Sequence, residues 1–140
     1  MKYFQKGANN TAVWQVEFSL NNSIGTQKPI LSEESLIKLS SDLPMGKSWH
    51  NDLVVYGDLE STCVCVWKNS DRVEISCRFD VSSLKKDVLN TVIDFAKANN
   101  LMIVYDGQEV PMTFDSIKGV LINSPAYKFL KNPSTFFDSI

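Results

Sequence analysis

The sequence lacks the long runs by which several protein classes are recognised. No apolar stretch approaches the roughly 18 residues that a membrane span needs, and the first ten residues, MKYFQKGANN, do not have the pattern of a signal peptide. No run of five basic residues occurs, and the formal net charge is −2. The chain therefore has no basic field for a phosphate backbone. We predict a soluble, cytoplasmic protein that binds no membrane and makes no direct contact with nucleic acid.

Motifs of nucleotide binding and of nucleophilic catalysis are also missing. The sequence contains no G-x-x-x-x-G-K-[ST], no G-x-G-x-x-G and no G-x-S-x-G, and the letters MGKS at 45–48 match only the end of a phosphate loop. The single histidine, His50, lies two residues from Asp52, a pairing that would suit a general base. Without a nucleophile or cofactor motif beside this pair, we predict that the protein is not an enzyme and carries no cofactor.

Cysteine is scarce, and its spacing argues against a metal site. The chain has three cysteines, Cys63 and Cys65 in TCVCVW and Cys77 in RVEISCRFDV. An odd number suits a reducing compartment better than a disulfide framework. The C-x-C spacing has no C-x₂-C or paired-histidine partner, and a C-x-x-C redox motif is absent. We therefore predict no metal site and interpret the cysteines as small apolar residues on strands.

The orientation of these cysteines depends on how two neighbouring strands pair. A four-residue turn over 69–72 would place Lys68 opposite Val73, which puts Cys77 in the core and turns Cys63 and Cys65 to the other face. A slip of one residue would instead set Cys63 opposite Cys77 and turn the first pair inward. The sequence leaves both registers open.

Hydrophobic residues make up 44 % of the chain, and their spacing predicts strands and helices in one domain, 1–140. Residues 1–11 are expected to be a loose lead-in. Alternation predicts strands over 13–20, with Trp14, Val16, Phe18 and Leu20 on one face, over 52–68 as one bent strand or two short ones broken near Gly57, and over 73–81 and 101–106. A further edge strand is expected within 107–111.

Two helices are predicted from apolar spacing and capping residues. The first runs from a Ser32 cap to Pro44, and the second covers 84–98, with Ser82 or Ser83 as its cap and Asn99-Asn100 at its end. The tail 113–140 suggests short helices separated at Ser124-Pro125 and Asn132-Pro133. The order β-α-β-β-α-β predicts an α+β fold of the split βαβ, ferredoxin-like kind, an antiparallel sheet with two helices on one face, plus a helical C-terminal tail.

Acidic residues recur near the expected turns, and the aromatic residues Trp49, Tyr56, Trp67 and Tyr105 lie within or beside these regions. Aromatic anchors among acids on an open sheet face would suit a basic protein partner, since acids steer the encounter and aromatic rings supply buried area. The alternative is that the aromatics belong to the core, and that Asp58 and Glu60 are simply the wet face of a strand or an acid pair for divalent ions. Our candidate partner-binding residues are Asp58, Glu60, Trp67, Glu74, Asp106 and Glu109.

Two segments resemble the small bacterial immunity proteins of contact-dependent growth inhibition and related polymorphic toxin systems. They are RVEISCRFDVSSLKKDVLNTVIDFAKANNLMIVYDGQEV and the tail LINSPAYKFLKNPSTFFDSI. The resemblance implies a cytoplasmic binder that occludes or distorts a toxin domain, commonly a nuclease, from a neighbouring cell. The resemblance assigns no functional role to any individual residue of this chain. The net charge of −2 is smaller than electrostatic capture of a strongly basic nuclease would favour.

The sequence supports two further hypotheses. One is a small-molecule-binding regulatory module of the ferredoxin-like type, in which the open sheet face forms a pocket or a homodimer. The other is an enzyme that uses His50 with Asp52. The immunity protein, with the C-terminal domain of a cognate toxin as its partner, remains our first hypothesis.

Overall fold

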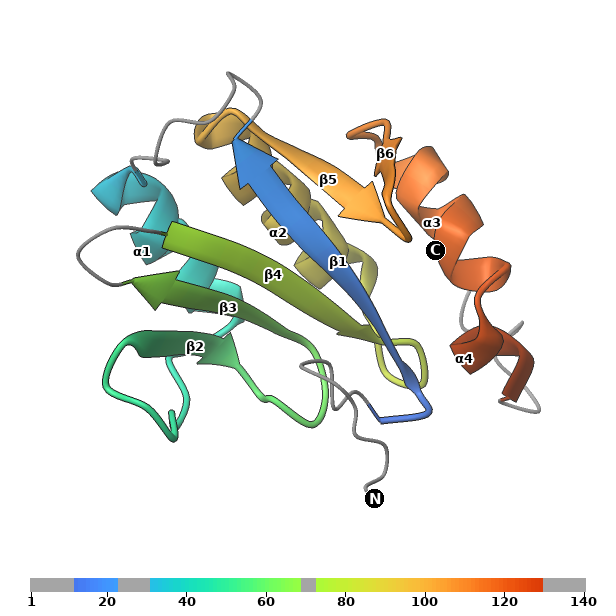
Figure 1. Cartoon of the computed structure of the whole chain (residues 1–140), viewed down its shortest axis with the longest axis horizontal. Helices are drawn as coiled ribbons and strands as arrows, with labels where there is room; N and C mark the ends of the chain where they lie inside the picture. The colour runs from blue at the N-terminus through green and yellow to red at the C-terminus, as the bar shows by residue number, and fades with distance from the viewer. Residues whose placement is uncertain (1–11, 23–30, 69–72, 130–140) are drawn as a thin grey trace.

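The fold is α+β, as predicted, with a six-stranded antiparallel sheet and four helices (Figure 1). The computed structural model describes residues 12–22, 31–68 and 73–129. Across the sheet the strands run in the order β2-β3-β4-β1-β5-β6. The elements are β1 (Gln15–Asn22), α1 (Glu33–Asp42), β2 (Leu53–Gly57), β3 (Cys63–Lys68), β4 (Val73–Asp80), α2 (Lys86–Ala98), β5 (Leu101–Tyr105), β6 (Gln108–Val110), α3 (Phe114–Ile122) and α4 (Pro125–Phe129).

The order of elements is longer than the β-α-β-β-α-β that we predicted. The segment 52–68 forms two short strands, β2 and β3, which was the second of the two alternatives, and β6 is the edge strand expected within 107–111. The described chain therefore reads β-α-β-β-β-α-β-β-α-α. The cause of the division is local, because Gly57 has a φ of 103°, which ends β2 and turns the chain back. In the tail, α3 and α4 are separated at Ser124-Pro125 as expected. The expected lead-in 1–11 and the break at Asn132-Pro133 lie outside the described residues.

The first of the two registers considered for β3 and β4 is the correct one. Lys68 pairs with Val73, Val64 with Cys77, and Cys63 with Arg78. Cys77 is fully buried in the main core, while Cys63, Cys65 and Trp67 share the opposite face of the sheet. A one-residue slip would exchange these two sets of side chains, so the pairing decides which residues each face carries.

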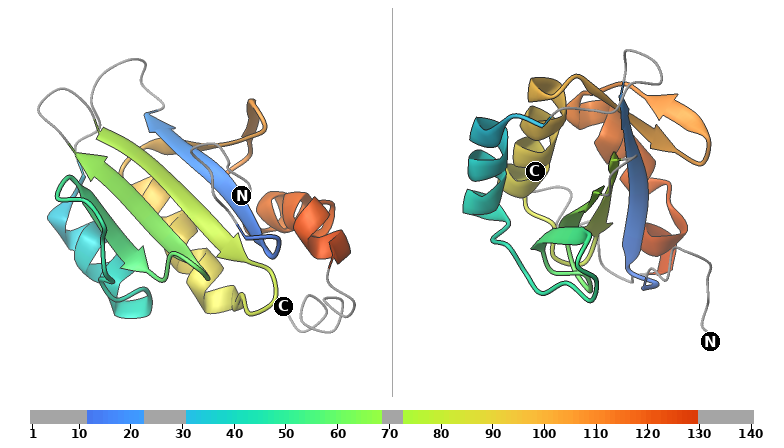
Figure 2. Two further views of the ribbon diagram at one scale, coloured as in Figure 1. Left: turned by 60° about the horizontal axis from the view of Figure 1, so that its bottom comes forward. Right: turned by 60° about the vertical axis from the view of Figure 1, so that its left-hand side comes forward.

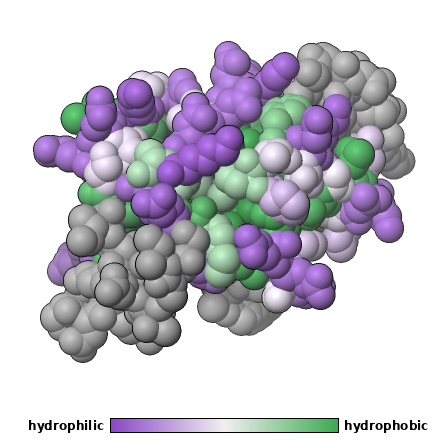
Figure 3. Space-filling model, turned by 90° about the horizontal axis from the view of Figure 1, so that it is seen from above, coloured by the Kyte–Doolittle hydropathy of each residue, from purple (hydrophilic) through white to green (hydrophobic). Residues whose placement is uncertain are grey.

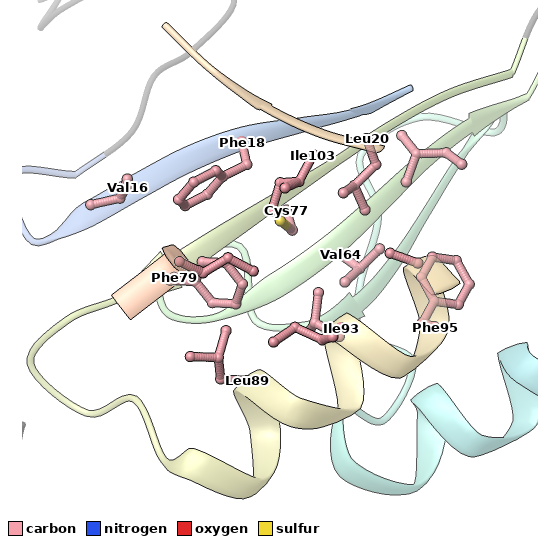
Figure 4. Close-up of a cluster of buried hydrophobic side chains, with 14 of the residues drawn as sticks. Val16, Phe18, Leu20, Val64, Cys77, Phe79, Leu89, Ile93, Phe95 and Ile103 are labelled. Carbon is pink, nitrogen blue, oxygen red and sulfur yellow. The ribbon is translucent and has the colours of Figure 1, made fainter. Parts of the chain in front are cut away.

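The main core lies between one face of the sheet and α2 (Figure 4). Each central strand sends alternate side chains to this face, as a half-buried strand should. The phenyl rings of Phe18 and Phe79 meet edge to face, with 5.5 Å between their centroids. The labelled side chains are Val16, Phe18 and Leu20 from β1, Val64 from β3, Cys77 and Phe79 from β4, Ile103 from β5, and Leu89, Ile93 and Phe95 from α2.

The helices close this core from several directions. Helix α1 contacts α2 and β2, and α2 contacts β5 and α3. Figure 2 shows α1 and α2 running side by side. Ile117 and Leu121 bring α3 into the same apolar cluster. No helix within the three described ranges is long and apolar enough to cross a membrane. In the view of Figure 3, hydrophilic residues are interspersed with smaller apolar areas.

The two predicted helix caps have different outcomes. The side chain of Ser32 accepts a hydrogen bond from the backbone N–H of Ser35, so the first cap is confirmed. The second is wrong, because α2 begins after Lys85 and no side chain caps it. Ser82 and Ser83 instead donate their hydroxyl hydrogens to the carboxylate of Asp80, a charged acceptor that takes both.

The prediction that Trp14 shares a strand face with Val16 is also wrong. Strand β1 begins at Gln15, and Trp14 lies before it with 36 % of its surface exposed. Its indole N–H donates to the backbone carbonyl of Glu60 at 2.9 Å. A distant carbonyl therefore holds the tryptophan outside the core.

The outer edge of β2 is covered by the chain that follows α1. Gly46 N donates to Val55 O, and Gly57 N donates to Pro44 O, each at 2.8 Å. A Cβ at Gly46 would lie 2.4 Å from the carbonyl oxygen of Gly57. Glycine is therefore required for this close approach of two backbones.

Replacing Gly57 by alanine should lower the free energy of unfolding by about 1–3 kcal/mol, because its φ is 103° and a Cβ would lie 2.4 Å from Thr62 O. Urea unfolding measures the change. Gly119→Ala is the matched control, since a Cβ there meets nothing within 4 Å and α3 gains helix propensity. Equal stability of the wild type and Gly57→Ala would contradict the strain argument.

Candidate partner-binding surface

The loop between β2 and β3 presents two of the predicted acids, Asp58 and Glu60. It is a tight turn in which Asp58 N donates to Thr62 O and Ser61 N donates to Asp58 O. One oxygen of the Asp58 carboxylate also accepts from Glu60 N at 2.9 Å. Both acids are exposed. Their backbone is therefore held in one conformation while their charges face solvent.

Hydrogen bonds from distant parts of the sheet hold this loop down. The side-chain amide of Gln15 donates to Leu59 O at 2.9 Å and to Ser61 O at 2.7 Å. Arg78 Nη1 donates to Leu59 O at 3.2 Å, and the Trp14 bond to Glu60 O adds a fourth contact. The Leu59 side chain packs against the apolar cluster on this face of the sheet, which also contains Leu53, Val55, Cys63, Cys65 and Trp67.

The buried carboxylate of Asp80 ties the same loop to the segment before α2. It accepts from the Ser61 hydroxyl at 2.9 Å and from the Ser83 hydroxyl at 3.1 Å. Ser82 donates to it through both its backbone N–H and its hydroxyl. Because four donors surround the carboxylate, its burial is compensated. The arrangement is structural, and it fixes where Asp58 and Glu60 lie.

The opposite end of the β2–β3 hairpin carries a cluster of three aromatic rings. Trp49 lies 5.3 Å from Trp67 and 5.9 Å from His50, measured between ring centroids, and His50 lies 5.2 Å from Trp67. Trp49 is 69 % exposed, and Trp67 is partly buried against the apolar cluster of this face. We call Trp49, His50 and Trp67 the aromatic cluster.

A network of short hydrogen bonds fixes the turn that carries the aromatic cluster. Ser48 and His50 bond to each other twice, since the Ser48 hydroxyl donates to His50 O and receives a bond from His50 N. Asp52 N donates to His50 Nδ1 at 3.0 Å, and Lys68 N donates to Asp52 O. His50 thus meets the backbone of Asp52, and no hydrogen bond between His50 and the Asp52 carboxylate is found in this part of the described chain. The pairing expected of a general base is therefore absent here.

The six predicted contact residues do not form one patch. Trp67 belongs to the aromatic cluster, and Glu74 is its cross-strand partner on β4. Asp58 and Glu60 lie at the other end of β3, about 13 Å along the strand. Glu109 lies on β6, where it pairs with Val104 of β5, and Asp106 is in the β5–β6 turn with a φ of 52°. Four strand spacings, about 19 Å, separate β3 from β6.

The sequence prediction counted Trp49 among the surface aromatics but chose only Trp67 as an aromatic contact residue, and it did not include His50. The signal that could have identified them is the adjacency of Trp49 and His50 in the turn before β2. The third ring, Trp67, lies on β3, the strand that pairs with β2. Tyr56 and Tyr105, which were considered among the surface aromatics, lie elsewhere. Tyr56 is buried in the main core, and Tyr105 lies half-buried, 5.3 Å from the ring of Phe18.

The cysteines are buried thiols. Cys63 and Cys65 point the same way from β3 with 3.8 Å between their sulfur atoms, and neither is more than 5 % exposed. The hydrogen bond to Cys65, together with burial, raises the pKa of Cys63, and burial raises that of Cys77. Among the described residues, no group of three or more His, Cys, Asp or Glu side chains could hold a metal ion.

A partly buried ion pair lies on the same face, where Glu17 of β1 stands opposite Arg78 of β4. The closest approach, from Glu17 Oε1 to Arg78 Nε, is 3.8 Å, which is too long for a hydrogen bond. Desolvation raises the pKa of the Glu17 carboxyl, and the charge of Arg78 lowers it by less. The ionised form of Glu17 therefore carries a net cost in the folded state.

Comparison with known proteins assigns this chain to no family. No protein-family model matches the chain, and searches of curated proteins and of solved structures find no match.

The raised pKa of Glu17 predicts a pH dependence of stability. A carboxyl whose pKa is higher in the folded than in the unfolded state binds more protons when folded, so its contribution to stability is lost as pH rises from about 4.5 through the folded pKa. In urea unfolding at several pH values, Glu17→Gln should remove this loss, gaining stability relative to the wild type as pH rises. Glu109→Gln makes the same change of charge at an exposed position and is the control. A difference between wild type and Glu17→Gln that does not vary with pH would contradict the assignment.

Proposed function

We propose that this protein is an immunity protein that binds a cognate bacterial toxin domain, a nuclease by the resemblance noted above, and neutralises it by occluding its active site. The exposed Trp49 on a hydrogen-bonded turn carries the proposal. Tryptophan is enriched among the few residues that dominate binding energy. A rigid turn lowers the entropy that such an anchor loses on binding.

The acids Asp58 and Glu60 support the same surface. An interface of about 800 Å² per partner is about 30 Å across, so one contact centred on β3 can include the aromatic cluster at one end and the acidic loop at the other. Carboxylates at the rim of such a contact accelerate the encounter with a basic partner and add less to its lifetime. Asp106 and Glu109, near the far edge, fall outside this contact.

Removing the Trp49 side chain should weaken the complex. With the toxin domain encoded next to this chain's gene, Trp49→Ala should raise the dissociation constant at least tenfold, because a buried aromatic anchor is lost. The unfolding free energy should change by less than about 0.5 kcal/mol, since the residue is exposed. Ile37→Ala, at an exposed apolar residue of α1, is the control.

Co-expression of the toxin domain with and without this protein tests the proposal as a whole. Restored viability together with a stable complex supports it. Failure to rescue, with no complex, overturns it for that toxin. Unchanged affinity of Trp49→Ala in a complex that does form would move the contact away from the aromatic cluster.

Neutralising the two acids should slow association without weakening the fold. Asp58→Asn with Glu60→Gln keeps an oxygen to accept the Glu60 N–H and removes both charges. The association rate should fall about twofold to tenfold at low salt, and the difference should vanish at high salt. Asp106→Asn with Glu109→Gln is the matched control near the far edge of the sheet. Equal rates for both double variants would exclude steering by the loop.

A second candidate is a small-molecule regulatory module, and a pocket of about 420 Å³ favours it. The pocket lies between the β2–β3 loop and the start of α2, and Asp58, Ser61, Thr62, Ser83 and Lys85 line it. We further propose that β3, β4, β1 and β5 with α1 and α2 form a ferredoxin-like core to which β2 and β6 are added. A metabolite that raises the melting temperature would favour the module over the immunity protein.

A further inference from the structure

Two thiols lie side by side on the sheet face opposite the main core. Cys63 and Cys65 project the same way from β3, and their sulfur atoms are 3.8 Å apart and share a hydrogen bond. Both side chains are buried. Cys77 belongs to the main core on the other face, so it is not part of this pair. Two neighbouring sulfur atoms on one strand can hold one ion between them.

The geometry of the strand favours an ion over an internal disulfide. Residues two apart on a strand have Cα atoms about 6.6 Å apart. Disulfides span roughly 4.4–6.8 Å between Cα atoms, so this pair lies at the upper limit. With metal–sulfur bonds of about 2.3 Å, sulfur separations of about 3.8 to 4.6 Å correspond to angles at the metal between about 110° and 180°. The pair can therefore bind an ion with little movement of its side chains.

A positive charge lies beside the two thiols. Arg78 of β4 is the cross-strand partner of Cys63, and its side chain is 14 % exposed. Glu17 stands on the other side of Arg78, so the guanidinium lies between the carboxyl and the thiols. The hydrogen bond with Cys63 lowers the pKa of Cys65, burial raises it, and the charge of Arg78 lowers it. Two thiolates around a monovalent cation carry a single negative charge, which Arg78 can offset.

We propose that Cys63 and Cys65 bind one copper(I) ion through two thiolates. Soft thiolate donors select copper(I), zinc and iron–sulfur clusters among biological metals. A structural zinc ion takes four ligands. Copper(I) is satisfied by two thiolates, which is the donor set that this pair supplies. The sequence argument against a metal site rested on missing further ligands, so it applies to zinc and not to this ion.

The binding step and the surroundings of the pair are compatible with copper(I). Two S–H bonds break, two Cu–S bonds form and two protons pass to solvent, while no atom changes its oxidation state. Leu53 and Val55 of β2 belong to the same apolar cluster, and Leu59 packs against it. These apolar side chains exclude water from the ion. Because Leu59 is half-buried on a loop, entry requires movement of a side chain and not of a strand. The site is independent of the proposed function.

Competition with a chromogenic chelator tests the site in the intact protein. Under anaerobic conditions with a thiol-free reductant, the wild type should remove one equivalent of copper(I) from its bicinchoninate complex. Cys63→Ala and Cys65→Ala should each weaken copper(I) binding more than about a hundredfold, because the loss of a partner outside the ligands alone costs 10–100-fold. Cys77→Ala removes a thiol from the other face and is the matched control. Circular dichroism checks that each variant folds.

A second measurement uses the wild type alone. Phenylarsine oxide condenses with two neighbouring thiols and releases one water, so mass spectrometry of the folded protein should show one adduct, and prior loading with copper(I) should prevent it. The inference is overturned if the wild type takes no copper(I) from bicinchoninate, if Cys77→Ala weakens binding as much as Cys65→Ala, or if the adduct still forms after loading. Several equivalents of copper(I), bound alike by all variants, would show an adventitious ion only.

Discussion

The pairing of β3 with β4 is the constraint on which the rest of this molecule depends. With Lys68 opposite Val73, the alternate residues of β3 divide between two apolar clusters, Val64 and Val66 with the helices and Cys63 and Cys65 on the other face. The same division turns Trp67 toward the turn that carries Trp49. Core packing and the proposed binding surface are therefore two results of one register.

The β2–β3 loop shows how a surface is made rigid without secondary structure. Its backbone carbonyls accept from Trp14, which precedes β1, from Gln15 of β1 and from Arg78 of β4. The Asp80 carboxylate adds a connection to the segment before α2. Charged residues on such a loop keep a fixed position relative to the sheet, which is what directional steering of a partner requires.

Patterns confined to one element were predicted well from the sequence. Alternation located β4, and Ser32 caps α1 as expected. The register of β3 with β4 was one of two that the sequence left open. The failures are at residues whose partners are distant or in competition. Ser82 and Ser83 had a capping role available, but the charged Asp80 took their hydrogen bonds. Trp14 is positioned by a hydrogen bond to Glu60, 46 residues away, and Trp49 by a ring contact with Trp67, 18 residues away. Local periodicity carries no information about contacts at such separations.

The cover over β2 has a consequence for how copies of this chain could associate. The segment at 44–46 already occupies the outer edge of β2, so no further strand can join there. At the other end, within the described ranges, no backbone hydrogen bond reaches the outer edge of β6, which is three residues long with the charged Glu109 at its centre. Among the described strands, a further strand can therefore be added only at β6. An assembly built by pairing of two such edges stops at two molecules.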